Sequence, residues 1–112
     1  MDNQLRLDRL SARAAQDGVN EQRRIKHLPV ASALRDPSHV DSIIALAKVQ
    51  VQLWRDRRLC SGDYIAAWDE LLQQPARAAV ILEEQSARAI ALRQNSPFVS
   101  SVRQLNALIH AA

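Results

Sequence analysis

Apolar residues recur three and four positions apart through most of this chain, the spacing that places side chains on one face of a helix. The longest such seam lies in the middle of the sequence and predicts a helix over about 37–59. Its members are Val40, Ile44, Ala47, Val51 and Trp54.

The apolar arc of this predicted helix is wider than the seam alone, because Leu46, Val49 and Leu53 fall outside it. An apolar arc of more than half the circumference has to be covered from two sides. We therefore expect the helix to lie at the centre of the fold or at a subunit interface.

Capping residues mark where the other helices begin. Ser61 is a start signal for a helix over 62–74, because a serine hydroxyl can accept a hydrogen bond from a free N–H of the first turn. Proline at the first helical position costs no hydrogen bond, so three further starts are predicted, at Asp36-Pro37, Gln74-Pro75 and Ser96-Pro97. The segment after Gln74 is expected to run to Arg93, with a polar patch at 83–86 that can divide it, and the last helix covers 97–111.

The N-terminal third is predicted to contain two shorter helices. A helix over 3–17 is expected to end at Gly18, since glycine readily adopts the left-handed conformation that closes a helix. Its apolar stripe consists of Leu7, Leu10 and Ala14. A second helix would begin at the cap Asn20 and be stopped by Pro29, leaving 30–36 as a connection.

These elements predict an all-α fold: a compact bundle of five to six helices in a single domain over 1–112, packed around the long helix at about 37–59. Residues 1–18 are the candidate for a loosely attached N-terminal helix. The abundance of alanine, leucine, arginine and glutamine, with only two glycines and four prolines, also favours helix over sheet.

Composition narrows the compartment and the class of protein. Cys60 is the single cysteine, so no intrachain disulfide can form and the compartment is expected to be reducing. No apolar run has the length of a signal peptide or a membrane span. A cytoplasmic protein with no membrane partner is the expectation.

The net charge of +3 is unevenly distributed. Residues 1–58 hold eleven Lys or Arg against seven Asp or Glu, and residues 59–112 hold four against five. A basic half is suited to nucleic acid or to an acidic protein, because both respond to summed positive potential. An ordinary solvated surface would show the same composition.

Residues 10–28 have alanines, then Gly18, then a polar stretch rich in arginine and glutamine. This order resembles a helix-turn-helix DNA-binding unit, in degenerate form because Asp17 and Arg24 stand where that family has apolar residues. The resemblance implies a recognition helix that contacts the major groove through Asn20, Gln22, Arg23, Arg24, Lys26 and His27. Two short helices that close over the core remain the alternative.

Catalytic chemistry finds little support in the pattern. The three histidines, His27, His39 and His110, are far apart, and none has the spacing of a metal site. Glu83 and Glu84 are adjacent, so on a helix they diverge instead of converging as an acid and base would. We therefore expect no enzyme activity, no metal and no cofactor.

The function expected from the sequence is a small regulatory or interaction protein that binds a protein partner through a helical surface and self-associates as a dimer. The residues chosen for packing or self-association are Val40, Ile44, Val51, Trp54, Tyr64 and Trp68, since large aromatic residues serve both cores and binding surfaces. An electrostatic rim is expected at Arg55, Arg57 and Arg58, which also suit the end of a helix dipole. The alternative is a DNA-binding regulator of the antitoxin or repressor kind that uses residues 10–28.

Overall fold

The computed structural model describes residues 2–103 and confirms the all-α class. Within that range the chain forms five helices and begins a sixth at residues 99–103. The five are α1 (Asp2–Leu34), α2 (Val40–Arg57), α3 (Gly62–Leu72), α4 (Pro75–Glu83) and α5 (Ala87–Gln94). The part of the predicted last helix beyond Arg103, including His110, lies outside the described residues.

The predicted division of the N-terminal third is wrong. α1 is one 33-residue helix that continues through Gly18 and Pro29 without interruption. A glycine inside a helix costs only about 1 kcal/mol relative to alanine, and Gly18 does not adopt a positive φ. Pro29 removes one hydrogen bond, but Val30 and Ala31 directly after it are fully buried, and their packing keeps the helix intact.

The predicted starts at Ser61 and Pro75 are confirmed, whereas the predicted start at Pro37 is not. The Ser61 hydroxyl accepts a bond from the N–H of Tyr64, and Ser86 caps α5 in the same way through Ala89. Pro75 occupies the first turn of α4. α2 begins at Val40, three residues after the predicted start, because the Asp36 carboxylate accepts from the N–H of Ser38 and holds a separate turn there.

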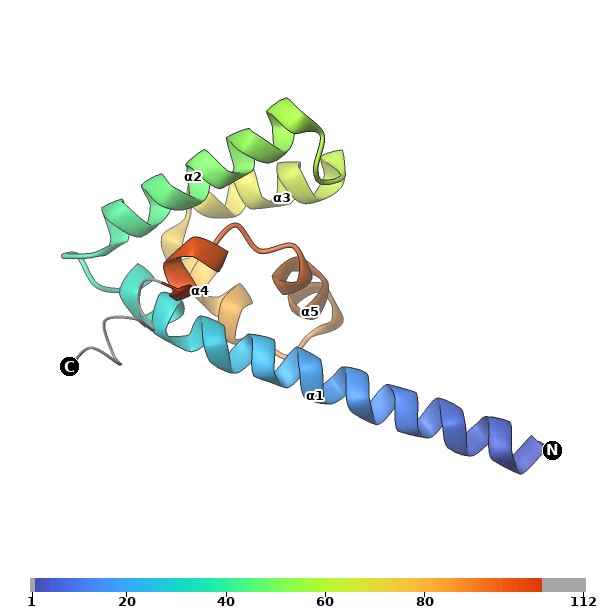
Figure 1. The fold of residues 1–112 in the computed structure, drawn as a ribbon. Coiled ribbons are helices and arrows are strands. Elements are labelled where there is room, and N and C mark those ends of the chain that lie inside the picture. The colour runs from blue at the N-terminus through green and yellow to red at the C-terminus, as the bar shows by residue number, and fades with distance from the viewer. Residues whose placement is uncertain (1, 104–112) are drawn as a thin grey trace.

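α4 takes the inner position in the bundle. It packs along α1 and also contacts α3 and α5, while α2 lies on the other side of α3 and meets the end of α1. Figure 1 shows α2 and α3 as one antiparallel layer over the layer formed by α1, α4 and α5. α2 therefore has one buried face, and Leu46 and Val49 on its wide apolar arc are exposed.

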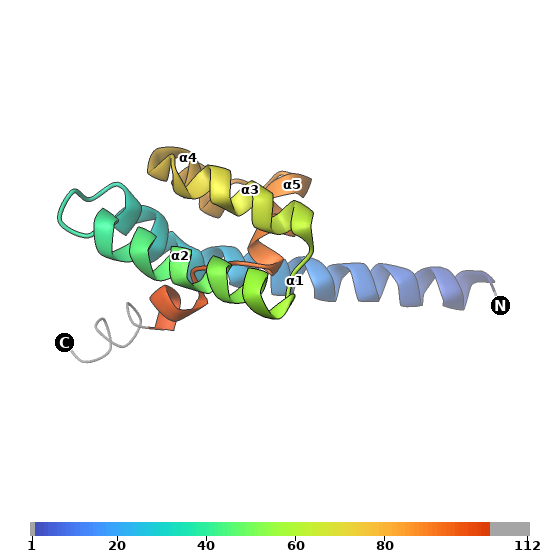
Figure 2. The ribbon, with the colours of Figure 1, turned by 90° about the horizontal axis from the view of Figure 1, so that it is seen from above.

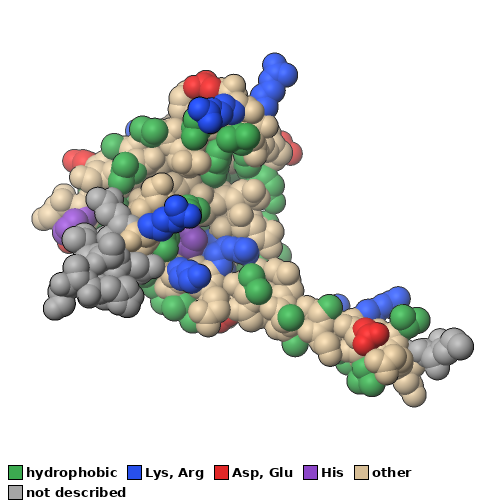
Figure 3. Space-filling model, in the orientation of Figure 1, with side chains coloured by type: hydrophobic (Ala, Val, Ile, Leu, Met, Phe, Trp, Pro, Cys, Tyr) green, Lys and Arg blue, Asp and Glu red, His purple; other side chains and the backbone are tan. Residues whose placement is uncertain are grey.

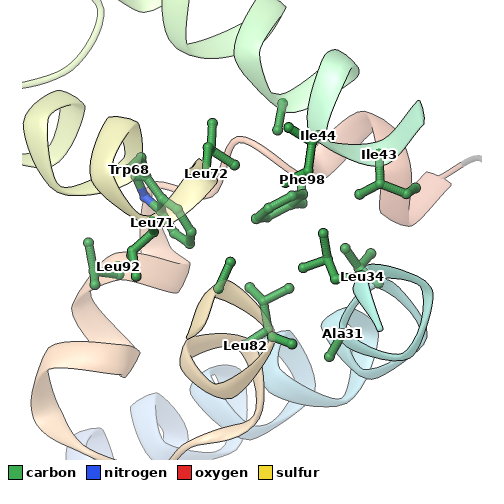
Figure 4. Close-up of a cluster of buried hydrophobic side chains, with 14 of the residues drawn as sticks. Ala31, Leu34, Ile43, Ile44, Trp68, Leu71, Leu72, Leu82, Leu92 and Phe98 are labelled. Carbon is green, nitrogen blue, oxygen red and sulfur yellow. The ribbon is translucent and has the colours of Figure 1, made fainter. Parts of the chain in front are cut away.

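One hydrophobic core joins all five helices and the segment after α5. Figure 4 shows these side chains meeting, with Trp68 from α3 and Phe98 from the last segment pointing toward each other. Their rings lie edge to face with centroids 5.6 Å apart, and neither residue is accessible to solvent. Aromatic pairs in this geometry stabilise a core beyond the area that they bury.

Most residues predicted for packing or self-association serve this core. Ile44, Val51, Trp54 and Trp68 are buried, and Val40 and Tyr64 are partly buried against them. Their side chains are therefore largely covered within one chain, as the packing alternative requires. No helix in residues 2–103 combines the length and the apolar character needed to span a membrane.

The first half of α1 extends away from the bundle. All residues from 3 to 18 are exposed, and both Figure 1 and Figure 2 show this part of the helix projecting beyond the others. The molecule is elongated for this reason: its longest dimension is 56 Å, and a 33-residue helix alone spans about 50 Å. We call residues 2–18 the arm.

Candidate binding site: a basic groove beside a buried histidine

His27 lies on the face of α1 that packs against the bundle. It shares that face with Val30, Ala31 and Leu34, at the i, i+3, i+4 and i+7 spacing of one helical stripe. The imidazole is only 4% exposed. A polar ring at such a position needs hydrogen-bond partners at both nitrogens.

Both nitrogens of the His27 ring have a partner. Nδ1 lies 2.7 Å from the backbone carbonyl of Arg23, which can only accept, so Nδ1 carries the proton. Nε2 lies 2.8 Å from the hydroxyl of Ser96, which then donates to it. The Ser96 oxygen in turn accepts from the N–H of Phe98 at 3.0 Å. This chain of bonds joins α1 to the segment after α5.

A serine hydroxyl bonded to a histidine is also the geometry of an activated nucleophile. Here the histidine is oriented by a carbonyl instead of a carboxylate, which stabilises a positive ring less well. Burial is the largest cause that lowers the pKa of His27, helped by the charges of Arg93 and Arg23 and opposed by the bond to the Arg23 carbonyl. The ring is therefore held neutral, and Ser96 serves as a cap and a bridge.

Arg93 is a second buried polar residue at this position. It extends from α5, is 3% exposed, and donates through Nη1 to the carbonyls of Ile81 and Glu84 at 2.7 and 2.6 Å. These carbonyls are at the end of α4, so Arg93 closes that helix. Burial, and then the charge of Arg24, lower the pKa of Arg93.

A groove of about 840 Å³ opens beside these residues, between α1 and the segment from Arg93 to Arg103. Its lining combines positive charge with apolar surface. The charged side chains are Arg23, Lys26, Arg93 and Arg103, and the apolar ones are Ala15, Val19, Val99 and Val102. Figure 3 shows lysine and arginine side chains gathered around a histidine on this hollowed face. We call this feature the basic groove.

The helix-turn-helix prediction is wrong as a structure. Residues 10–28 lie within one continuous helix, so there is no turn to set a recognition helix against a supporting one. The six residues assigned to the major groove also divide between different environments. Gln22, Arg23, Lys26 and His27 line the basic groove, whereas Asn20 accepts bonds from Gln16 and Arg23.

Arg24 faces α4 instead of the basic groove. It forms two bonds to the carboxylate of Glu21 and one to the carbonyl of Glu83. Arg35, directly after the end of α1, forms an ion pair with the Glu83 carboxylate at 2.5 Å, and this bond lowers the pKa of Glu83. Arg24 and Arg35 therefore attach α1 to the end of α4, and Arg24 is not available to read bases.

The predicted electrostatic rim is divided in a similar way. Arg55 forms an ion pair with Asp69 and links α2 to α3. Arg57 and Arg58 are exposed at the end of α2, where Arg58 adopts a left-handed conformation with φ of 53° and closes the helix. Neither of them lines the basic groove, so the two clusters do not form one site.

One indication of the His27 site is present in the sequence itself. A histidine in register with Val30, Ala31 and Leu34 on an apolar stripe indicates burial, and a buried imidazole needs polar partners. The identity of the partner Ser96 was not accessible, because it lies 69 residues away. Ser96 had already been recognised as a cap, which is one of its two roles.

Within residues 2–103, no three His, Cys, Asp or Glu side chains gather closely enough to hold a metal ion. No protein-family model, curated protein or solved structure matches this chain.

Proposed function

We propose that this protein is a non-enzymatic interaction protein that self-associates through the arm of α1. The observation that supports this is the exposure of its apolar stripe: Leu7 and Leu10 are 57% and 51% exposed, and all residues from 3 to 18 are exposed among the described residues. Isolated helices of this length are marginal in water, because tertiary packing supplies most helical stability. Packing against a second helix would therefore stabilise the arm.

The stripe points in a direction that the rest of the chain does not cover. At 100° per residue, Leu7, Leu10 and Ala14 centre about 150° around α1 from the stripe of Val30 and Leu34 that faces α4. The two stripes cannot both face the same bundle. The arm therefore presents its leucines to another molecule.

A second copy of the chain fits this surface in the antiparallel direction. Arg6 and Asp17 lie on the same flank of the stripe, eleven residues apart, and neither forms an ion pair within the described residues. In an antiparallel pair equal flanks face each other, so Arg6 of each copy meets Asp17 of the other on either side of the two-fold axis. The charges of the arm thus complement themselves.

The proposal includes a cytoplasmic location and a regulatory role, in which the dimer presents its surface to a protein partner. The lone Cys60 supports a reducing compartment. His27 and Ser96 support a non-enzymatic reading, because both are buried and bonded within the fold.

The test is the molar mass in solution, measured by light scattering after size exclusion over a range of concentrations. The unchanged chain is expected to be a dimer, and a Leu7→Asp, Leu10→Asp variant a monomer. Leu46→Asp with Val49→Asp is the matched control, because it places two charges on exposed apolar positions of α2 and should remain dimeric. A monomer at millimolar concentration would refute the proposal.

The direction of pairing has its own test. Arg6→Asp alone should weaken dimerisation by about threefold, since exposed ion pairs contribute modestly, and Arg6→Asp with Asp17→Arg should restore it. Such a recovery is the signature of a direct contact in a double-mutant cycle. If the double variant is weaker than the single one, the antiparallel arrangement is wrong.

A further inference from the structure

The basic groove gathers positive charge without any acidic residue in its described lining. Residues 104–112, which follow it in the chain, contain no Asp or Glu either. The four ion pairs of residues 2–103 lie elsewhere and involve Arg24, Arg35, His39 and Arg55. Cations concentrated in one hollow repel each other, and an anion there relieves that repulsion.

Three of the groove cations have free donors. Lys26 and Arg103 are exposed and form no ion pair or side-chain hydrogen bond within the described residues, and Arg23 bonds only to the neutral side chain of Asn20. A carboxylate or phosphate group could accept from all three without breaking an existing ion pair. Charge-assisted hydrogen bonds of this type are the strong ones.

The apolar part of the lining needs a different partner. Val19 and Val99 are 50% and 48% exposed although they stand in a concave surface, and Val102 is half-buried beside them. Water forms no hydrogen bonds with valine side chains. A hydrocarbon chain or ring would cover them, and burial of apolar surface stabilises a complex by about 25 cal/mol per Å². Inorganic phosphate alone would leave this part of the groove unused.

The wall of the groove is held in place before any ligand arrives. His27, Ser96 and Arg93 are each at least nine-tenths buried. His27 and Ser96 are hydrogen-bonded to each other, and His27 and Arg93 also bond to backbone carbonyls. Preorganised walls lower the entropic cost of binding. The volume of about 840 Å³ falls within the range of small-molecule sites, roughly 300 to 1,000 Å³.

We propose that the basic groove binds a small amphipathic anion, a carboxylate or phosphate joined to an apolar chain or ring. The charged group meets Arg23, Lys26 and Arg103, and the apolar part packs on the three valines. This site lies about 130° around α1 from the stripe of Leu7, Leu10 and Ala14, so ligand binding and self-association use different faces.

The test is calorimetric titration of the full chain, with ¹H–¹⁵N NMR to locate the site. Four probes separate the contributions: octyl phosphate, octanoate, inorganic phosphate and 1-octanol. Octyl phosphate or octanoate is expected to bind at least about tenfold more tightly than inorganic phosphate or 1-octanol. The tighter-binding of the two amphipathic probes identifies the preferred headgroup. The largest resonance shifts are expected at Val19, Lys26 and Val99.

A Lys26→Gln, Arg103→Gln variant should weaken binding of the better probe about tenfold, because two charge-assisted contacts are lost. The control is Lys48→Gln with Arg57→Gln, which also removes one lysine and one arginine charge, but from the exposed surface of α2, and should leave the affinity unchanged. Leu7→Asp with Leu10→Asp should also leave it unchanged.

Three outcomes would overturn the proposal. The first is 1-octanol binding as tightly as octyl phosphate, and the second is equal loss of affinity in the control variant. The third is displacement of the probe by a short DNA duplex with a steep dependence on salt, which would assign the groove to nucleic acid instead.

Discussion

The two halves of α1 are built from similar residues but have opposite surroundings. Leu7 and Leu10 in the arm are more than half exposed, whereas Val30 and Leu34 in the second half are buried. The second half packs against α4, whereas every residue of the arm from 3 to 18 is exposed. An apolar stripe thus specifies a helix and a direction, while the partner that faces it decides whether the stripe becomes core.

The largest difference is expected when one leucine from each half is shortened. Leu34→Ala should lower the free energy of unfolding by about 3 kcal/mol, because it leaves a cavity in a packed core. Leu10→Ala should change it by less than about 0.5 kcal/mol in dilute solution. Urea unfolding at low protein concentration measures both, and equal losses would show that the arm is packed within the monomer.

A smaller contrast is expected between Ser96, which is bonded to His27 in the buried half of α1, and Ser11 on the arm. Ser96→Ala leaves the Nε2 of His27 and the N–H of Phe98 without their partner, which should cost about 2 kcal/mol because buried polar groups are expensive to leave unpaired. Ser11→Ala on the exposed arm should change the free energy of unfolding by no more than about 0.5 kcal/mol. The same urea experiment distinguishes them, and a neutral Ser96→Ala would contradict the bridging role.

The smallest effect is a pH dependence that belongs to the buried half alone. The unfolded chain protonates His27 near pH 6.5, but the folded chain resists because its pKa is lowered by burial. Stability is thus fully present above about pH 6.5 and declines as pH falls toward the lowered pKa of the folded state. Unfolding midpoints at a series of pH values should show this decline.

Two variants isolate the cause of that decline. His27→Gln should flatten the curve below pH 6.5, whereas Lys48→Gln, an exposed change that leaves His27 in place, should retain the decline. An unchanged slope in His27→Gln would assign the effect to other groups.

The parts of the fold that were predicted from the sequence depend on local chemistry. Ser61 and Pro75 act through hydrogen bonds or steric limits within their own turn, so their meaning does not depend on the rest of the chain. The breaks at Gly18 and Pro29 were predicted by the same logic and were wrong. There the local cost is small, and in the second case it is outweighed by the burial of Val30 and Ala31.

The candidate site was predictable only in part. Gln22, Arg23 and Lys26 were predicted as polar contacts to DNA and do line the basic groove, but their neighbours Arg93, Ser96 and Arg103 come from the far end of the chain. Periodicity reports what a helix presents and carries no information on which distant segment meets it. The residues that a tertiary contact brings together are therefore the ones that sequence patterns leave out.

The bridge between His27 and Ser96 also sets the order in which the protein can fold during synthesis. α1 is made first, but its partner α4 and the hydroxyl of Ser96 follow about 40 to 70 residues later. Contacts between distant segments form late, because the intervening chain has to be ordered first. Until then both stripes of the nascent helix are uncovered at once, and transiently exposed apolar surface of this kind favours premature association. The stripe of the second half is buried when the bundle folds, and only the stripe of the arm stays exposed in the folded protein.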